Sequence, residues 1–81
     1  INFMKITGRQ LRMARVAMKW RVDDLSKKCG VPWARLQLFE RSDEFIEESE
    51  KTEKIINTFI SNNIEFKEGD SDYLPYIKIK K

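Results

Sequence analysis

The chain has 81 residues and a formal net charge of +3, which fits one small domain with a single hydrophobic core. It contains one cysteine, Cys29, and no histidine, so an internal disulfide, a zinc finger and a histidine-dependent catalytic site are excluded. There is neither an apolar run of the roughly 20 residues that a membrane span needs nor a signal-peptide pattern, so we expect a soluble protein of a reducing, cytoplasmic compartment.

The first predicted helix runs from about Gly8 to Met18. Thr7 can cap it, because its hydroxyl can accept from the free amides of the first turn. The apolar residues Leu11, Ala14, Ala17 and Met18 recur at helical spacing. A short break follows at residues 19–21, where we expect the ring of Trp20 to seal the first helix against the second.

Two short helices come next, joined by a tight turn. The apolar positions from Val22 to Cys29 predict a helix that Gly30 ends, because glycine adopts the left-handed conformation at little cost. Without a histidine to activate it, Cys29 is expected to be a small buried hydrophobe. Pro32 suits the first turn of the following helix, which we expect to end near Glu40 or Arg41.

The second half of the chain is acidic at first and then regular. In residues 41–53 the apolar pair Phe45 and Ile46 indicates one helical turn or a loop anchored by that pair. An amphipathic helix is expected from about Lys51, ending at Asn62 and Asn63, since asparagine tolerates the left-handed cap. Residues 63–81 alternate as strands around a turn-rich segment and predict a β-hairpin.

The predicted fold is therefore mostly α, with four to five short helices and a C-terminal β-hairpin. Residues 1–81 form one domain, with a helical core at 6–62 and a hairpin tail at 63–81.

Residues 22–40 meet the steric needs of a helix-turn-helix. Two helices that cross closely need a small residue, which Ser26 supplies, and the tight turn needs the positive φ that Gly30 can adopt. The positions that would form the shared core are apolar: Leu25, Cys29, Val31, Leu36 and Phe39. A generic helical hairpin is the alternative that this pattern leaves open.

Over about residues 6–41 the chain resembles the Cro and lambda-repressor superfamily of bacterial and phage regulators, the XRE family. The resemblance rests on the segments TGRQLRMARVAMKW, DDLSKKCGV and LQLFER, and more weakly on the tail FISNNIEFKEGDSDYLPYIKIKK. It implies a lambda-repressor-like fold and a cytoplasmic, nucleoid-associated transcriptional regulator of bacterial or phage type. Such a protein binds double-stranded DNA sequence-specifically and needs no cofactor or metal.

The chain also departs from the family pattern. Arg21 and Val22 stand where the family has a small polar cap and a glutamine that touches the DNA backbone. Pro32 replaces the serine or threonine cap of the recognition helix, and Ser42 replaces the glycine after it. We therefore expect one phosphate contact to be lost or transferred to Arg21.

The resemblance assigns the positions that face the DNA groove to Trp33, Ala34, Arg35, Gln37 and Leu38. Arginine can bond guanine O6 and N7 as a pair, and glutamine can do the same with adenine N6 and N7. The other three offer only apolar contact, for example to thymine methyl groups, and partial burial at the helix entry is the alternative for Trp33. An exposed tryptophan and leucine also fit a second hypothesis, a protein-interaction module of the antitoxin or anti-repressor kind that has lost specific DNA readout.

Charge is unevenly distributed along the chain. Residues 1–41 hold ten Lys and Arg against three Asp and Glu, a net +7, whereas residues 42–81 hold six against ten, a net −4. Such polarity suits a domain that offers one face to a polyanion, although two solvated faces of different charge would look the same. Besides Arg35, we expect the DNA phosphate contacts to come from Arg9, Arg12, Arg21, Lys27, Lys28 and Arg41.

The apolar residues of the predicted hairpin suggest that the chain forms a homodimer. An isolated two-stranded ribbon is marginal in water, and its apolar residues Ile64, Phe66, Ile77 and Ile79 need a partner. Two copies pairing through their hairpins would place two recognition helices about 34 to 36 Å apart, one DNA turn. Packing of the strands on the chain's own helices is the alternative.

An ion pair is expected between the first helix and the recognition helix. The resemblance pairs Arg15, late in the first helix, with Glu40 at the end of the recognition helix. A carboxylate there opposes the helix dipole, so it needs a compensating cation, and a guanidinium can hold it by two bonds.

The acidic pairs Asp23/Asp24 and Glu47/Glu48 are interpreted as solvated charge, so we expect no enzyme.

Overall fold

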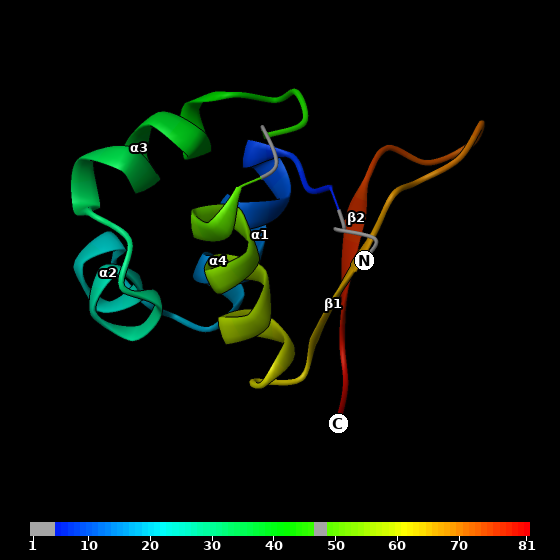
Figure 1. Cartoon of the computed structure of the whole chain (residues 1–81). Coiled ribbons are helices and arrows are strands. Elements are labelled where there is room, and N and C mark those ends of the chain that lie inside the picture. Colours follow the sequence, from blue (N-terminus) through cyan, green and yellow to red (C-terminus); the bar gives the residue numbers. More distant parts are fainter. Residues whose placement is uncertain (1–4, 47–48) are drawn as a thin grey trace.

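The structure is a computed structural model that describes residues 5–46 and 49–81. Within these residues the chain forms four α-helices followed by an antiparallel two-stranded hairpin (Figure 1). The elements are α1 (Gly8–Ala17), α2 (Val22–Cys29), α3 (Trp33–Arg41), α4 (Glu50–Ile60), β1 (Ile64–Lys67) and β2 (Tyr76–Ile79). The mostly α architecture with a C-terminal hairpin is as predicted. Glu47 and Glu48 lie outside the described residues.

The start of α1 follows the predicted cap. The Thr7 hydroxyl accepts from the backbone amide of Gln10 at 3.0 Å, and the Gln10 side chain accepts from the Thr7 amide at 2.8 Å. The helix ends at Ala17, one residue before the predicted end, and Met18 caps it. Lys19 then adopts a left-handed φ of 60°, a turn that the sequence pattern did not predict and that leads into α2.

The segment after α3 is extended at Phe45 and Ile46 and pairs there with the residues just before α1. Phe45 pairs with Thr7 in an isolated antiparallel bridge, and the Ile46 amide donates to the Ile6 carbonyl at 2.8 Å. Ile46 is buried, whereas Phe45 is 49% exposed. The predicted apolar anchor is therefore right for Ile46 and wrong for Phe45, because neighbouring side chains of an extended segment point to opposite sides.

The second half begins with a capped helix. The Ser49 hydroxyl accepts from the Thr52 amide at 3.3 Å, and Ile55, Ile56 and Phe59 of α4 are buried in the core. The helix ends at Ile60, earlier than predicted. The left-handed asparagine is confirmed, since Asn63 has a φ of 69° and leads into β1.

The hairpin and α3 lie on opposite sides of the molecule, with α1 and α4 between them (Figure 1). In the hairpin Ile64 pairs with Ile79 and Phe66 with Ile77. Ile64 and Phe66 are buried, Ile77 is half-buried and Ile79 is exposed. The chain's own helices thus cover most of the apolar face for which a partner was expected.

The ring of Trp20 contacts both α2 and α4. Its ring stacks on Phe59 of α4 with centroids 5.5 Å apart, and the Lys28 ammonium lies 5.0 Å from the centroid of the Trp20 ring. The tryptophan therefore joins the α1–α2 link to α4, a contact beyond the predicted one between the first two helices.

Gln10 joins α1 to the hairpin. Its side chain is fully buried, and its amide nitrogen donates to the carbonyls of Lys67 at 2.7 Å and Tyr76 at 2.9 Å. Because its oxygen accepts from Thr7, both ends of this buried amide are hydrogen-bonded. The end of the ribbon is fixed to the first turn of α1.

Candidate nucleic-acid interface

The exposed side of α3 is defined by the residues that it buries. Leu36 and Glu40, one turn apart, are 0% and 7% exposed. Leu38 is two residues from each, about 200° around the helix, and therefore lies at the centre of the outward face. It is 57% exposed.

The five candidate base-reading residues are not equally accessible. Trp33 is 47% exposed, Ala34 and Arg35 are also exposed, and Gln37 is half-buried. The outward face thus combines an apolar centre with the guanidinium of Arg35 beside it. Trp33 is therefore a surface residue, and the alternative of its partial burial at the helix entry is not supported.

The turn between α2 and α3 fixes the beginning of α3. Gly30 has a φ of 76°, and its amide donates to the Ser26 carbonyl at 2.9 Å. The Ser26 hydroxyl donates to the Val31 carbonyl at 2.7 Å. Pro32 lies just before the helix, one residue outside its predicted place, and its carbonyl accepts from the amides of Arg35 and Leu36. Ser26 therefore contributes a hydrogen bond besides its small size.

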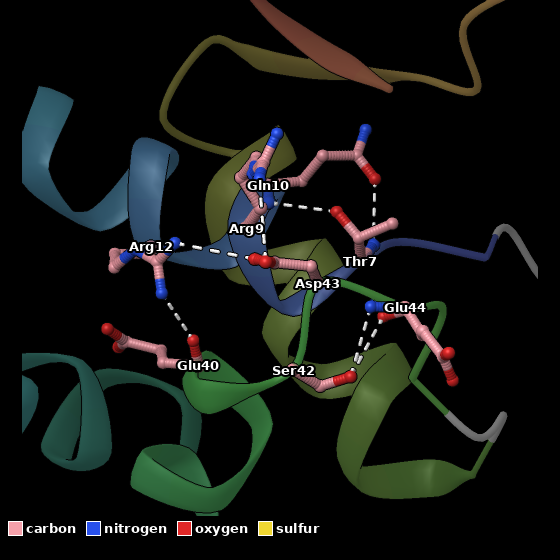
Figure 2. Close-up of polar contacts among 8 residues, drawn as sticks. All are labelled: Thr7, Arg9, Gln10, Arg12, Glu40, Ser42, Asp43 and Glu44. Carbon is pink, nitrogen blue, oxygen red and sulfur yellow. Dashed lines mark hydrogen bonds and ion pairs between the residues drawn. The ribbon is translucent and has the colours of Figure 1, made fainter. Parts of the chain in front are cut away.

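Two arginines of α1 hold the end of α3. Arg15 meets Glu40 by two bonds, Nε to Oε2 at 2.7 Å and Nη2 to Oε1 at 2.9 Å, and its Nη1 donates to the Trp20 carbonyl at 2.8 Å. Arg12 donates from Nη1 to the Glu40 carbonyl at 2.6 Å (Figure 2). The Arg15 and Glu40 side chains are only 17% and 9% exposed. The structure brings the predicted pair together, and Arg12 adds a bond to the last turn of α3, where the helix dipole favours a cation.

Gly8 makes this contact between α1 and α3 close. A Cβ atom at Gly8 would collide with the carbonyl oxygens of Phe39 and Ser42. The φ of Gly8 is one that any residue can adopt, so glycine is needed at this position only because a side chain would not fit. Sequence reasoning placed Gly8 at the helix start and missed this role, which depends on residues more than 30 positions away.

The candidate phosphate-binding residues are spread over α1, the end of α3 and both ends of α2. Arg9, Arg12 and Arg41 lie along α1 and at the end of α3, Arg21 precedes α2, and Lys27 and Lys28 are in the last turn of α2. Several are already engaged. Both Arg9 and Arg12 approach Asp43, and Lys28 lies over Trp20.

Of the acidic pair on α2, Asp23 is exposed as predicted, whereas Asp24 has a structural role. The Asp24 carboxylate accepts from the Arg21 amide at 2.9 Å, which satisfies a free amide at the helix start, and Asp23 is exposed beside it. In the described part of the chain no group of three or more Cys, Asp or Glu residues could hold a metal ion. Among the same residues no helix is both long and apolar enough to cross a bilayer.

Cys29 is buried, as predicted, and packs in the core. Burial raises the pKa of its thiol above the ordinary value, so the neutral form is favoured. A nucleophilic role is not supported by this environment.

A hollow of about 380 Å³ lies beside the outward face of α3. It is lined by Arg35 and Phe39 of α3 and by Ser49, Glu50 and Lys51 at the start of α4. Lys51 therefore lies on the same hollow as Arg35, a second cation that no sequence signal pointed to. Comparison of the chain with protein-family models, with curated proteins and with solved structures finds no match.

Proposed function

We propose that the chain is a sequence-specific, double-stranded-DNA-binding transcriptional regulator of the helix-turn-helix type. In this proposal α2, its glycine turn and α3 form the motif, and residues 32–40 enter the major groove. The observation that carries it is that α3 is held at both ends while its outward face stays exposed. A helix fits a groove about 12 Å wide, and rigid placement is what base reading requires.

The outward face sets the kind of contacts expected. Arg35 suits a guanine, whereas Leu38 and Ala34 suit the methyl groups of thymines at the centre of the site. Gln37 is half-buried and must extend along the helix to reach an adenine, and Trp33 would contact the edge of the groove. Direct readout by Arg35 is thus the strongest expected source of discrimination.

The basic half of the chain supports the same proposal. Phosphate contacts from Arg9, Arg12, Arg21, Lys27, Lys28 and Arg41 would make the affinity fall steeply as salt rises. Titration of labelled genomic fragments by fluorescence anisotropy tests this, first at low salt and then over a salt series. Arg35→Ala should weaken binding to a selected site about tenfold while leaving binding to random DNA within about twofold.

A protein-interaction module is the second candidate, because Trp33 and Leu38 expose large apolar side chains. It predicts no binding to any fragment at low salt and capture of a defined protein that Leu38→Ala abolishes. Retention of DNA binding in wild-type protein would reject it.

We also propose that the chain forms a homodimer through its hairpin. It is supported by the open edges of the described two-stranded sheet and by Ile79 at the end of β2, which the chain's own helices leave exposed. Light scattering at tens of micromolar tests it. A monomer at that concentration would overturn it.

A further inference from the structure

Two arginines of α1 share one carboxylate in the loop after α3. Arg9 Nη2 lies 3.4 Å from Asp43 Oδ2, and Arg12 Nη2 lies 3.7 Å from Asp43 Oδ1 (Figure 2). The two arginines are three residues apart and therefore lie on one face of α1. The side chains are 43%, 44% and 60% exposed for Arg9, Arg12 and Asp43. Two cations and one anion thus meet at the solvent surface.

The positions of Arg12 and Asp43 are fixed by other contacts. Arg12 Nη1 is held by the Glu40 carbonyl, so only part of the guanidinium is left to meet Asp43. On the other side the Ser42 hydroxyl accepts from the Glu44 amide at 3.0 Å and closes a turn around Asp43 (Figure 2). The carboxylate is therefore presented to the two arginines by a local turn.

We propose that Asp43 is an internal competitor of DNA phosphate for Arg9 and Arg12. This inference rests on the proposed DNA-binding function, and it assigns to Asp43 the role of lowering the affinity of that surface for DNA. Asp43 and a DNA phosphate are both anions that are attracted to the same two guanidinium groups and repel each other, so they compete. The ion pairs of Asp43 with Arg9 and Arg12 are exposed and therefore weak, so a phosphate can displace Asp43. The attraction of this surface for the DNA backbone is nevertheless lower than two free arginines would give.

Asp43→Asn tests the proposal, because it removes the charge and keeps the size of the side chain. The probe is a pool of short, fluorescein-labelled duplexes of random sequence, since phosphate contacts act on every sequence. Affinities are measured between about 50 and 200 mM KCl. At the low-salt end the affinity of Asp43→Asn should exceed that of wild-type protein about threefold, and its slope of log affinity against log salt should be steeper by about 1.

Glu65→Gln is the matched control. Glu65 also contacts two cations, Lys67 at 3.9 Å and Lys80 at 3.8 Å, but it lies on the hairpin. It should change affinity by less than about twofold, since the two lysines that it releases lie on the hairpin, on the opposite side of the molecule from α3. Arg9→Gln should lower affinity more in the Asp43→Asn background than in wild-type protein. Urea denaturation verifies that each variant is folded.

Each failure has a distinct meaning. Binding of wild type and Asp43→Asn with equal affinity and equal salt slope would overturn this inference alone. An equal rise in Glu65→Gln would also overturn it, because net charge would then explain the effect. Absence of DNA binding by both wild type and Asp43→Asn would overturn the proposed function and this inference with it.

Discussion

The polar side chains through which α1 contacts α3 and the hairpin differ in charge. Toward α3 it uses ions, with Arg15 on the Glu40 carboxylate, whereas toward the hairpin it uses Gln10, a neutral amide. Gln10 is fully buried, but Arg15 reaches the surface and is 17% exposed.

The difference has a physical reason. A charge at the fully buried position of Gln10 would have to be desolvated and paired, whereas an amide needs only its hydrogen bonds. Near the surface an ion pair keeps part of its hydration. The placement of α3 should therefore respond to salt and to loss of charge, and the placement of the hairpin should not.

Gly8→Ala should have the largest effect and should break the α3 contact by sterics alone. The added Cβ collides with backbone oxygens of Phe39 and Ser42, which cannot rotate away, so we expect a loss of about 4 kcal/mol in the free energy of unfolding. Urea denaturation measures it. Gly30→Ala is the control, because a Cβ there meets nothing within 4 Å and only the φ of 76° is unfavourable. It should cost about 1 to 2 kcal/mol, and equal losses in the two variants would contradict the steric explanation.

Arg15→Ala or Glu40→Ala should rank second, at about 3 kcal/mol each, because either change leaves a mostly buried charge without its partner. The double variant should lose clearly less than the sum of the two single losses. Additive losses would show that the two side chains do not interact. Glu65→Gln, which affects exposed pairs on the hairpin, should cost about 0.5 kcal/mol or less.

Gln10→Leu should rank third, at about 2 kcal/mol. Leucine fills a similar volume but leaves the carbonyls of Lys67 and Tyr76 and the Thr7 amide without the bonds that Gln10 makes. Hydrogen exchange should show faster exchange in β1 and β2 and unchanged exchange in α3. Uniform acceleration over the whole chain would mean that Gln10 supports the core as a unit and not the hairpin in particular.

Salt should produce the smallest and most selective effect. In urea titrations with about 1 M KCl, the coupling energy between Arg15 and Glu40 should fall by about 0.5 kcal/mol, because a partly exposed pair is partly screened. The loss caused by Gln10→Leu should stay the same. If both values shift together, the charged and the neutral contact do not differ in their response to salt.

Elements set by local physical chemistry were predictable from the sequence. The Thr7 cap, the left-handed Gly30 and Asn63, and the order of four helices and a hairpin depend on neighbouring residues or on apolar spacing. Errors at the ends of α1 and α3 amount to one residue each, because the capping residue is half inside the helix. The juxtaposition of Arg15 with Glu40 came from the family resemblance and was supported by the helix dipole.

Only the tertiary structure decided the long-range contacts. The carbonyls that Gln10 binds are 57 and 66 residues away, and Asp43 faces Arg9 and Arg12 because α1 crosses the end of α3 closely over Gly8. The angle at which two elements pack determines these contacts, and no spacing in the sequence records that angle. The same applies to the hairpin, whose apolar residues show that it needs a partner without showing that α1 and α4 provide most of it.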